Sequence, residues 1–229
     1  MKKLNNVTLF GLDCVDINRL IKAAEICCKN FEFAKIKLLT SIPSKNKSVV
    51  AIKPVESARA YSEFILKQMN DYIDTDFALI VQHDGFILNP EAWDDEYLKY
   101  DYVGAPLWVE TELVVGNGGF SLRSKKLIEL LQNDKKIYIE QKPDHKYGQN
   151  EDWIISVTKR KYLESLGVKF APVELAHKFS FEKNLAYGAK WNGQFGFHGL
   201  TWTNISVWNK LHPEYKIDNT LTEKPDEFF

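Results

Sequence analysis

The sequence has little cysteine and no long apolar run, and each absence excludes a class of protein. Its three cysteines, Cys14, Cys27 and Cys28, form no CxxC pattern, so neither a disulfide framework nor a zinc-binding cysteine cluster is indicated. Reduced, partly buried thiols are expected, as in a cytoplasmic protein. No stretch reaches the roughly 18 apolar residues of a membrane-spanning helix, and the N-terminus lacks a signal-peptide pattern. Peripheral membrane contact is left open.

The chain also lacks an excess of charge of either sign. Its 30 Lys and Arg residues balance 31 Asp and Glu residues, for a net charge of −1. Because nucleic-acid binders usually carry a basic excess, nucleic acid is not expected as a main partner. Aromatic residues make up 13% of the 229 residues; they suit a core and also stack on bases and sugars.

Hydrophobic periodicity predicts an α/β fold. Residues 7–12 are a β-rich apolar run, residues 16–29 have helical spacing, and residues 35–40 alternate as a strand does. This strand–helix–strand order indicates a βαβ unit with parallel strands. The continuous apolar run 77–81 suits a central strand that is buried on both faces.

The remaining elements are less regular. Further strands are expected at 49–52, 102–105, 119–122 and 168–170, and helices at 57–72, 124–132 and 150–166. Asp16, Ser124 and Asn150 are suitable N-caps, and Gly167 suits a helix C-terminus. Neither a repeat nor a linker is evident, so a single domain over 1–229 is predicted, with a peripheral tail over about 212–229.

Two polar segments stand out near the predicted sheet. Gln82-His83-Asp84-Gly85 directly follows the buried strand 77–81, and in open α/β sheets ligands bind at the carboxyl ends of strands. Gly116-Asn117-Gly118-Gly119 has little side-chain bulk, so a ligand can approach its backbone closely. Taken singly, the first also fits a local turn and the second a hairpin turn.

Two further segments carry groups suited to catalysis and metal binding. Glu151 and Asp152 lie where a helix is expected to begin, a position that favours the ionised carboxylate a general base requires. His198 lies between glycines and aromatic residues in Phe195–Gly199, and a neutral imidazole is a good metal ligand. Each segment also has a purely structural interpretation: Glu151 and Asp152 can stabilise the start of a helix, and His198 can be a packing residue.

In combination, these segments resemble the GT-A class of glycosyltransferases. More narrowly, the chain is similar to a family of glycosyltransferase-like domains of unknown function from bacterial surface-polysaccharide loci. The resemblance is carried by residues 73–93, 100–108, 115–124, 150–153 and 170–182 and by the FGFHG segment at 195–199. It implies a GT-A-like, Rossmann-like single domain with a central, mostly parallel mixed sheet flanked by helices.

The resemblance also implies a metal site and a catalytic base. Asp84 matches the last residue of the DxD motif that binds the metal, but Gln82 replaces the first aspartate. His198 matches a further ligand, and Mn²⁺ or Mg²⁺ is expected. Glu151 and Asp152 match the xED element of inverting members. Asp152 is the preferred base with Glu151 orienting the acceptor, although the two roles could be exchanged.

The implied activity is metal-dependent, inverting transfer of a sugar from a nucleotide-sugar donor, with UDP-sugar the first choice, to a glycan hydroxyl. Two alternatives stay open: a non-catalytic sugar-binding or assembly subunit on a GT-A scaffold, and a sugar nucleotidyltransferase, although no basic Gly-rich loop lies near the N-terminus. The expected donor-binding residues are Asp13, Thr40, Arg59, Gln82, His83, Asp84, Asn117, Gly118 and Gly119.

Overall fold

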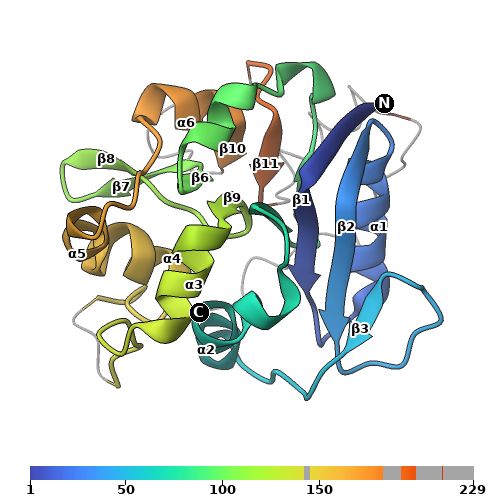
Figure 1. Ribbon diagram of the computed structural model, residues 1–229, viewed down its shortest axis with the longest axis horizontal. Coiled ribbons are helices and arrows are strands. Elements are labelled where there is room, and N and C mark those ends of the chain that lie inside the picture. The colour runs from blue at the N-terminus through green and yellow to red at the C-terminus, as the bar shows by residue number, and fades with distance from the viewer. Residues whose placement is uncertain (142–144, 183–191, 200–212, 214–229) are drawn as a thin grey trace.

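A six-stranded sheet forms the centre of the protein. The computed structural model describes residues 1–141, 145–182, 192–199 and 213 (Figure 1). The strand order is β3-β2-β1-β4-β9-β6, in which β3, β2, β1 and β4 are parallel, β9 is antiparallel to β4, and β6 is antiparallel to β9. The predicted mostly parallel, mixed sheet is therefore confirmed. The bounds are β1 (Lys2–Leu12), β2 (Phe31–Thr40), β3 (Val49–Ala51), β4 (Phe77–Val81), β6 (Tyr102–Gly104) and β9 (Phe120–Ser124).

Helices cover both faces of this sheet because successive side chains along its strands point to opposite faces, and both faces are apolar. In β1, Val7 and Leu9 pack with α1 (Ile17–Cys28), whereas Phe10 packs on the opposite face with α2 (Ala58–Lys67) and α3 (Lys125–Asn133). Figure 1 shows α1 on one side of the sheet and α2 and α3 on the other. The continuous apolar run in β4 is explained by burial on both faces.

Several predicted helix ends are confirmed. The side chains of Asp16, Ser57 and Ser124 accept hydrogen bonds from backbone amides in the first turns of α1, α2 and α3. Gly167, with φ of +81°, follows the last helical turn of its segment. The predicted helix 57–72 is shorter than expected: α2 ends at Lys67, and a 3₁₀ turn follows at Met69–Tyr72.

The prediction of one helix over 150–166 is wrong. The segment consists of α4 (Glu151–Trp153), a π-helical turn (Ile154–Thr158) and α5 (Arg160–Ser165). Four β-branched residues lie between 154 and 158, and such residues lose side-chain freedom in an α-helix. Asn150 precedes α4, but its side chain makes no capping hydrogen bond.

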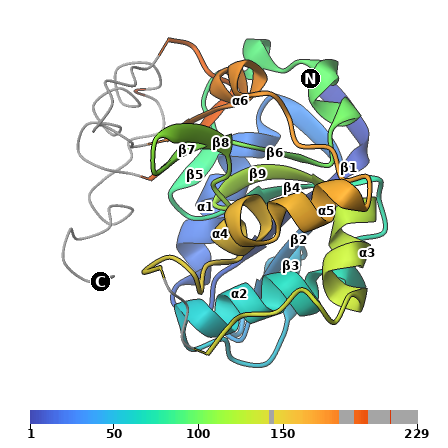
Figure 2. The ribbon, with the colours of Figure 1, turned by 90° about the vertical axis from the view of Figure 1, so that its left-hand side faces the viewer.

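Two small sheets and one further helix complete the described fold. The order β10-β11-β5 joins β10 (Ser180–Glu182), β11 (Gly196–His198) and β5 (Gly85–Ile87), and a hairpin pairs β7 (Pro106–Val109) with β8 (Glu112–Val115). Helix α6 (Val173–Phe179) precedes β10. Two 3₁₀ turns lie at Pro90–Ala92 and Asp95–Lys99. Figure 2 shows α4, α5 and α6 on the side of the molecule that carries the hairpin.

Four remaining expectations concern a strand, the thiols, membrane-spanning helices and the C-terminal tail. Residues 168–170 form only an isolated bridge between Phe170 and Tyr102 instead of a strand. Cys27 is buried, Cys14 and Cys28 are half-buried, and all three thiols are free. Within the part of the chain that the structure describes, no helix has the length and apolar character needed to span a bilayer. The predicted tail 212–229 lies outside the described residues, apart from residue 213.

Candidate functional site

A cavity of about 700 Å³ lies at one edge of the central sheet. The parallel strands β1 and β4 both end there, followed by Asp13 and by Gln82-His83-Asp84, and the antiparallel strand β9 begins there after Asn117-Gly118-Gly119. The amide of Gln82 donates a hydrogen bond to the carbonyl oxygen of Gly119, at 3.0 Å, which joins two of these segments. The volume is within the range of small-molecule sites.

The cavity brings together most of the residues that the sequence predicts for one site. Its lining includes Asp13, Gln82, His83, Gly118, Gly119, Glu151, Asp152 and His198. Four predicted residues are not part of that lining: Thr40, Arg59, Asp84 and Asn117. Asp84 and Asn117 nevertheless contact His198 from behind the cavity wall.

The small sheet β10-β11-β5 places His198 beside two other segments. His198 is in register with Gly85 of β5 on one side and with Glu182 of β10 on the other. The amide of Gly199 donates to the carbonyl oxygen of Asp84, at 2.9 Å. Backbone pairing therefore holds His198 against the polar segment after β4. The two segments are far apart in the sequence, so the sequence does not reveal this contact.

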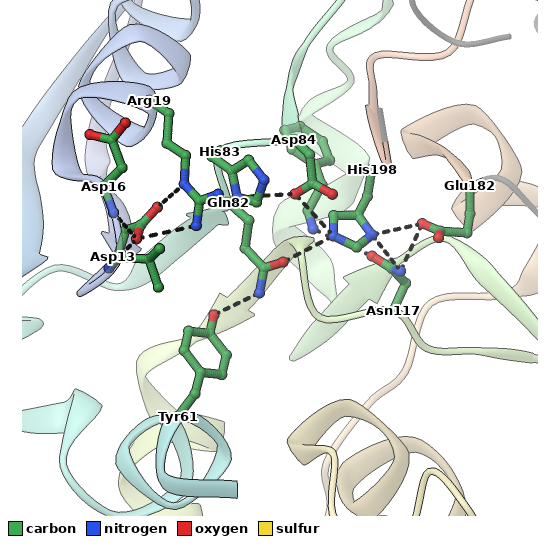
Figure 3. Close-up of polar contacts among 12 residues, drawn as sticks. Asp13, Asp16, Arg19, Tyr61, Gln82, His83, Asp84, Asn117, Glu182 and His198 are labelled. Carbon is green, nitrogen blue, oxygen red and sulfur yellow. Dashed lines mark hydrogen bonds and ion pairs between the residues drawn. The ribbon is translucent and has the colours of Figure 1, made fainter. Parts of the chain in front are cut away.

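Figure 3 shows the contacts of the His198 ring. Nδ1 lies 3.1 Å from Oε2 of Glu182, and Nδ2 of Asn117 donates to that same oxygen, at 2.7 Å. On its other side, Nε2 lies 3.0 Å from Oε1 of Gln82 and 3.5 Å from Oδ1 of Asp84. The Gln82 amide nitrogen donates to the hydroxyl of Tyr61, at 3.0 Å, so its oxygen is directed at His198.

Asp84 is the most unusual group of this cluster. Its side chain is 1% exposed, and neither carboxylate oxygen makes a hydrogen bond with the residues described. Burial raises the pKa of the carboxyl group, but His198 and His83 outweigh it and hold the pKa below its usual range. Burial likewise lowers the pKa of His198, whereas Asp84 and Glu182 raise it well above its usual value.

The geometry fits a cation between Asp84 and His198. Among the described residues, Gln82 and Asp84 present oxygen atoms to Nε2, so a proton or a metal ion there makes both contacts attractive. The 3.5 Å separation of Nε2 and Oδ1 is compatible with two bonds of about 2.1 Å to one ion. Glu182 at Nδ1 resembles the carboxylate that commonly orients a metal-bound histidine. No group of three or more His, Cys, Asp or Glu side chains within the described ranges is arranged to hold a metal.

The glycine loop has a packing role that the sequence does not reveal. A Cβ atom on Gly119 would lie 2.1 Å from the His198 ring, and one on Gly118 would lie 2.1 Å from Oε1 of Glu151. The two glycines therefore make room for side chains that arrive from distant parts of the chain. Asn117 adopts a left-handed conformation, with φ of +55°, which asparagine tolerates better than most residues.

The two adjacent carboxylates of α4 differ in their surroundings. Glu151 accepts a hydrogen bond from Nη2 of Arg123 at 2.8 Å, and Arg123 is fully buried. Asp152 has no such partner: its Oδ2 accepts from the amide of Gly118 at 3.0 Å and its Oδ1 from the amide of Trp153 at 2.7 Å. Burial first, and the charge of Glu151 second, raise the pKa of Asp152 to about 6.

Arg123 and Glu182 are site residues that the sequence analysis did not predict. Arg123 lies in the β9 segment that carries the family resemblance, and an arginine in a strand whose five residues are all buried requires a partner. That burial is known only from the structure, so the sequence marks Arg123 only by its place in a segment of the resemblance, which Glu182 shares through residues 170–182. Only the pairing of β10 with β11 brings Glu182 to His198.

The remaining predicted residues have structural contacts outside the cavity or at its rim. Arg59 donates from Nη1 and Nη2 to the carbonyl oxygens of residues 140 and 139. Thr40 is buried, and its hydroxyl accepts from the amide of Ile42 at 3.1 Å. His83 lines the cavity, and burial lowers the pKa of its imidazole.

The arrangement defines an α/β protein of the GT-A-like type. A solved structure of the apo-form glycosyltransferase GlyE in Streptococcus pneumoniae TIGR4 superposes with a TM-score of 0.57 over 95% of this chain and 62% of GlyE, at 14% identity. The bifunctional IspDF from Campylobacter jejuni matches less well, with a TM-score of 0.44 over 72% of this chain and 48% of IspDF, at 13% identity. The chain thus spans less than two thirds of either structure, and at these identities the likeness to GlyE concerns the fold alone.

The chain belongs to a family described as "Protein of unknown function (DUF5672)", whose pattern matches residues 46–198. That range includes both carboxylates of α4, the glycine loop and His198, but not β1 with Asp13. No curated protein matches the sequence.

Proposed function

We propose that this protein is a divalent-cation-dependent, inverting glycosyltransferase that uses a nucleotide-sugar donor. The observation that supports this most is the shared cavity at the carboxyl edge of the sheet: Asp152 and His198 line it, and the buried Asp84 lies 3.5 Å from Nε2 of His198 without a hydrogen bond to the described residues. The likeness of the fold to that of the glycosyltransferase GlyE agrees with the proposal.

The charge of the cavity favours a metal ion. Among the described residues that line it, Asp13, Glu56, Glu151 and Asp152 carry carboxylates, and Arg19 is the only Lys or Arg. A diphosphate entering this acidic cavity needs additional positive charge. Mn²⁺ or Mg²⁺ held by Asp84 and His198, with the Gln82 oxygen adjacent, would supply it and would stabilise the charge on the departing nucleoside diphosphate.

Asp152 is the proposed general base. Each of its oxygens accepts one backbone hydrogen bond and keeps a free lone pair for a proton. A pKa of about 6 leaves it mostly ionised at pH 7 and still basic enough to accept the proton of an acceptor hydroxyl. Glu151 forms an ion pair with Arg123, so its role is to hold the Arg123 guanidinium rather than to accept the proton.

The substrates follow from this assignment. The donor lies between the β1 end, with Asp13, and the glycine loop at Gly118 and Gly119, and a UDP-sugar is the first candidate. The acceptor is a hydroxyl group of a glycan that approaches Asp152. Polysaccharide synthesis in the cytoplasm is the proposed setting.

A ligand screen tests the function directly. Thermal unfolding of the protein is measured with UDP-, GDP- and CMP-sugars, each with and without Mn²⁺, and release of nucleoside diphosphate is assayed for every combination. We expect one nucleotide sugar to raise Tm only when Mn²⁺ is present, by the free energy of binding to the native state.

Other outcomes identify the alternatives. Stabilisation by free glycan alone would indicate a sugar-binding or assembly subunit. Release of pyrophosphate from a nucleoside triphosphate and a sugar phosphate would indicate a nucleotidyltransferase. Absence of any response to nucleotide sugars with Mn²⁺ would contradict the proposed activity.

A further inference from the structure

Arg19 occupies a special place in the cavity. It lies in the first turn of α1, and its side chain is 21% exposed. No other Lys or Arg of the described chain lines the cavity. An anionic ligand therefore meets one permanent positive charge on the protein, at the end of β1.

Asp13 holds the Arg19 side chain in place. Its Oδ2 accepts from Nε of Arg19 at 2.6 Å, and its Oδ1 accepts from the amides of Val15 and Asp16 at 2.8 and 2.9 Å. The Asp13 side chain is 5% exposed. Oδ1 thus accepts from two backbone amides and Oδ2 is bound by the guanidinium, so the Asp13 carboxylate holds both the start of α1 and the Arg19 side chain.

The opposite edge of the guanidinium remains available. Arg19 uses Nε, and more weakly Nη2 at 3.4 Å, toward Asp13, and Nη1 has no hydrogen bond to any residue that the structure describes. Figure 3 shows Arg19 between Asp13 and His83. A guanidinium fixed through one edge presents its remaining N–H groups in the geometry that phosphate oxygens accept.

We propose that Arg19 binds the diphosphate of the donor and that Asp13 is the residue that positions it. This inference rests on the proposed function, because it assumes that a nucleoside diphosphate enters the cavity. In this proposal Arg19 contacts the diphosphate at the end of β1. Asp13, which the sequence predicts as a donor-binding residue, acts only through Arg19.

Binding measurements separate diphosphate recognition from base recognition. The affinities of UDP, GDP, uridine, guanosine and inorganic pyrophosphate are measured by calorimetry in the presence of Mn²⁺ for the full chain and for Arg19→Met. We expect Arg19→Met to weaken pyrophosphate and the preferred nucleoside diphosphate about tenfold or more, the loss typical of a charge-assisted hydrogen bond, and to leave the nucleoside unchanged.

Three variants act as controls. Arg19→Lys keeps the charge and is expected to recover part of the pyrophosphate affinity. Asp13→Asn keeps the acceptor for the two backbone amides but loses the ion pair, so it should weaken pyrophosphate less than Arg19→Met does. Arg160→Met removes a guanidinium on α5 that pairs with Glu164 outside the cavity, and it should change no affinity. Circular dichroism and Tm report whether each variant folds.

The outcomes are distinct. Equal losses for nucleoside and nucleoside diphosphate, or no loss for pyrophosphate in Arg19→Met, would overturn the role of Arg19 while leaving the proposed function intact. Failure of the unmodified protein to bind any nucleoside diphosphate or pyrophosphate would overturn both.

Discussion

At the scale of single residues, the pair Glu151 and Asp152 shows how neighbours in sequence acquire different chemistry. Both begin α4, but the fully buried Arg123 binds only Glu151. Asp152 lines the cavity with two backbone hydrogen bonds and with no ion pair to a residue that the structure describes. Burial therefore raises the pKa of Asp152 to about 6, and this carboxylate is the one suited to accept a proton.

Asp152→Asn separates catalysis from stability. We expect turnover to fall by roughly 10²–10⁴-fold, the usual contribution of a general base, with donor affinity nearly unchanged. Because the pKa of Asp152 is raised from 3.8 to about 6 on folding, the native state binds more protons than the unfolded chain between these values. The contribution of Asp152 to the free energy of unfolding therefore falls as pH rises from about 4 to about 6 and stays lower above that range.

The asparagine variant lacks this pH dependence. Chemical denaturation at pH 4 and pH 8 should show equal stability at pH 4 and an advantage of about 1–3 kcal/mol for Asp152→Asn at pH 8. Activity of the unmodified protein should rise through an apparent pKa near 6. Glu151→Gln is the matched control: it weakens the contact with Arg123 and should reduce stability at both pH values. Full turnover in Asp152→Asn would refute the assignment of the base.

At the scale of elements, the loop before β9 is where distant segments converge. Gly118 makes room for the carboxylate of α4 and Gly119 for the imidazole of β11. The loop also joins β4 through the hydrogen bond from Gln82 to Gly119. Its lack of side-chain bulk thus serves the packing of the site as well as access for a ligand.

Alanine at the two glycines should have different consequences. Gly119→Ala places a methyl group against the His198 ring, so we expect a loss of about 1–3 kcal/mol in stability, as for an overpacked site, and loss of the Tm increase caused by Mn²⁺ with the preferred nucleotide sugar. Gly118→Ala displaces Glu151 instead. It should lower stability by a similar amount. Because Gly118 also borders the donor, the Tm increase with the nucleotide sugar should be smaller but should still depend on Mn²⁺, as measured by thermal unfolding.

These two variants test the metal assignment because the substituted glycines are adjacent, but one methyl group displaces His198 and the other Glu151. An unchanged Mn²⁺ response in folded Gly119→Ala would mean that His198 is not needed to hold the cation. Loss of the response in both variants would point to a general disturbance of the loop.

At the scale of the whole molecule, the Arg123–Glu151 ion pair links the central sheet to the helical segment that carries Asp152. The Arg123 guanidinium lies over the ring of Tyr102 at 5.1 Å and donates from Nε to the hydroxyl of Ser121 at 3.2 Å. Its Nη1 is buried without a hydrogen-bond partner among the described residues. The pair is therefore a costly interaction that joins two parts of the fold.

A double-mutant cycle measures this connection. Arg123→Met or Glu151→Leu alone leaves a buried, unpaired charge and should lower the free energy of unfolding by about 3–5 kcal/mol, whereas the double variant should be far less destabilised. Urea denaturation of the four proteins gives the coupling energy. Additive effects of the two single changes would show that the pair does not act as a unit.

The layout of the sheet and the polar segments at its edge can be predicted from the amino-acid pattern. The apolar runs of β1 and β4 and the caps Asp16 and Ser124 are visible in the chain as runs of apolar residues and as capping side chains at helix starts. Since parallel strands end at the same edge of a sheet, this pattern is also sufficient to place the segments after β1 and β4 together.

Which charged side chains of those segments come into contact depends on the tertiary fold. The contact of His198 with Glu182, the ion pair of Arg123 with Glu151 and the enclosure of Asp84 depend on pairings between segments that leave no periodic signal. Long-range packing decides which carboxylates are buried and what lies beside them: Arg123 binds Glu151, Asp152 is left to accept a proton, and Asp84 faces His198.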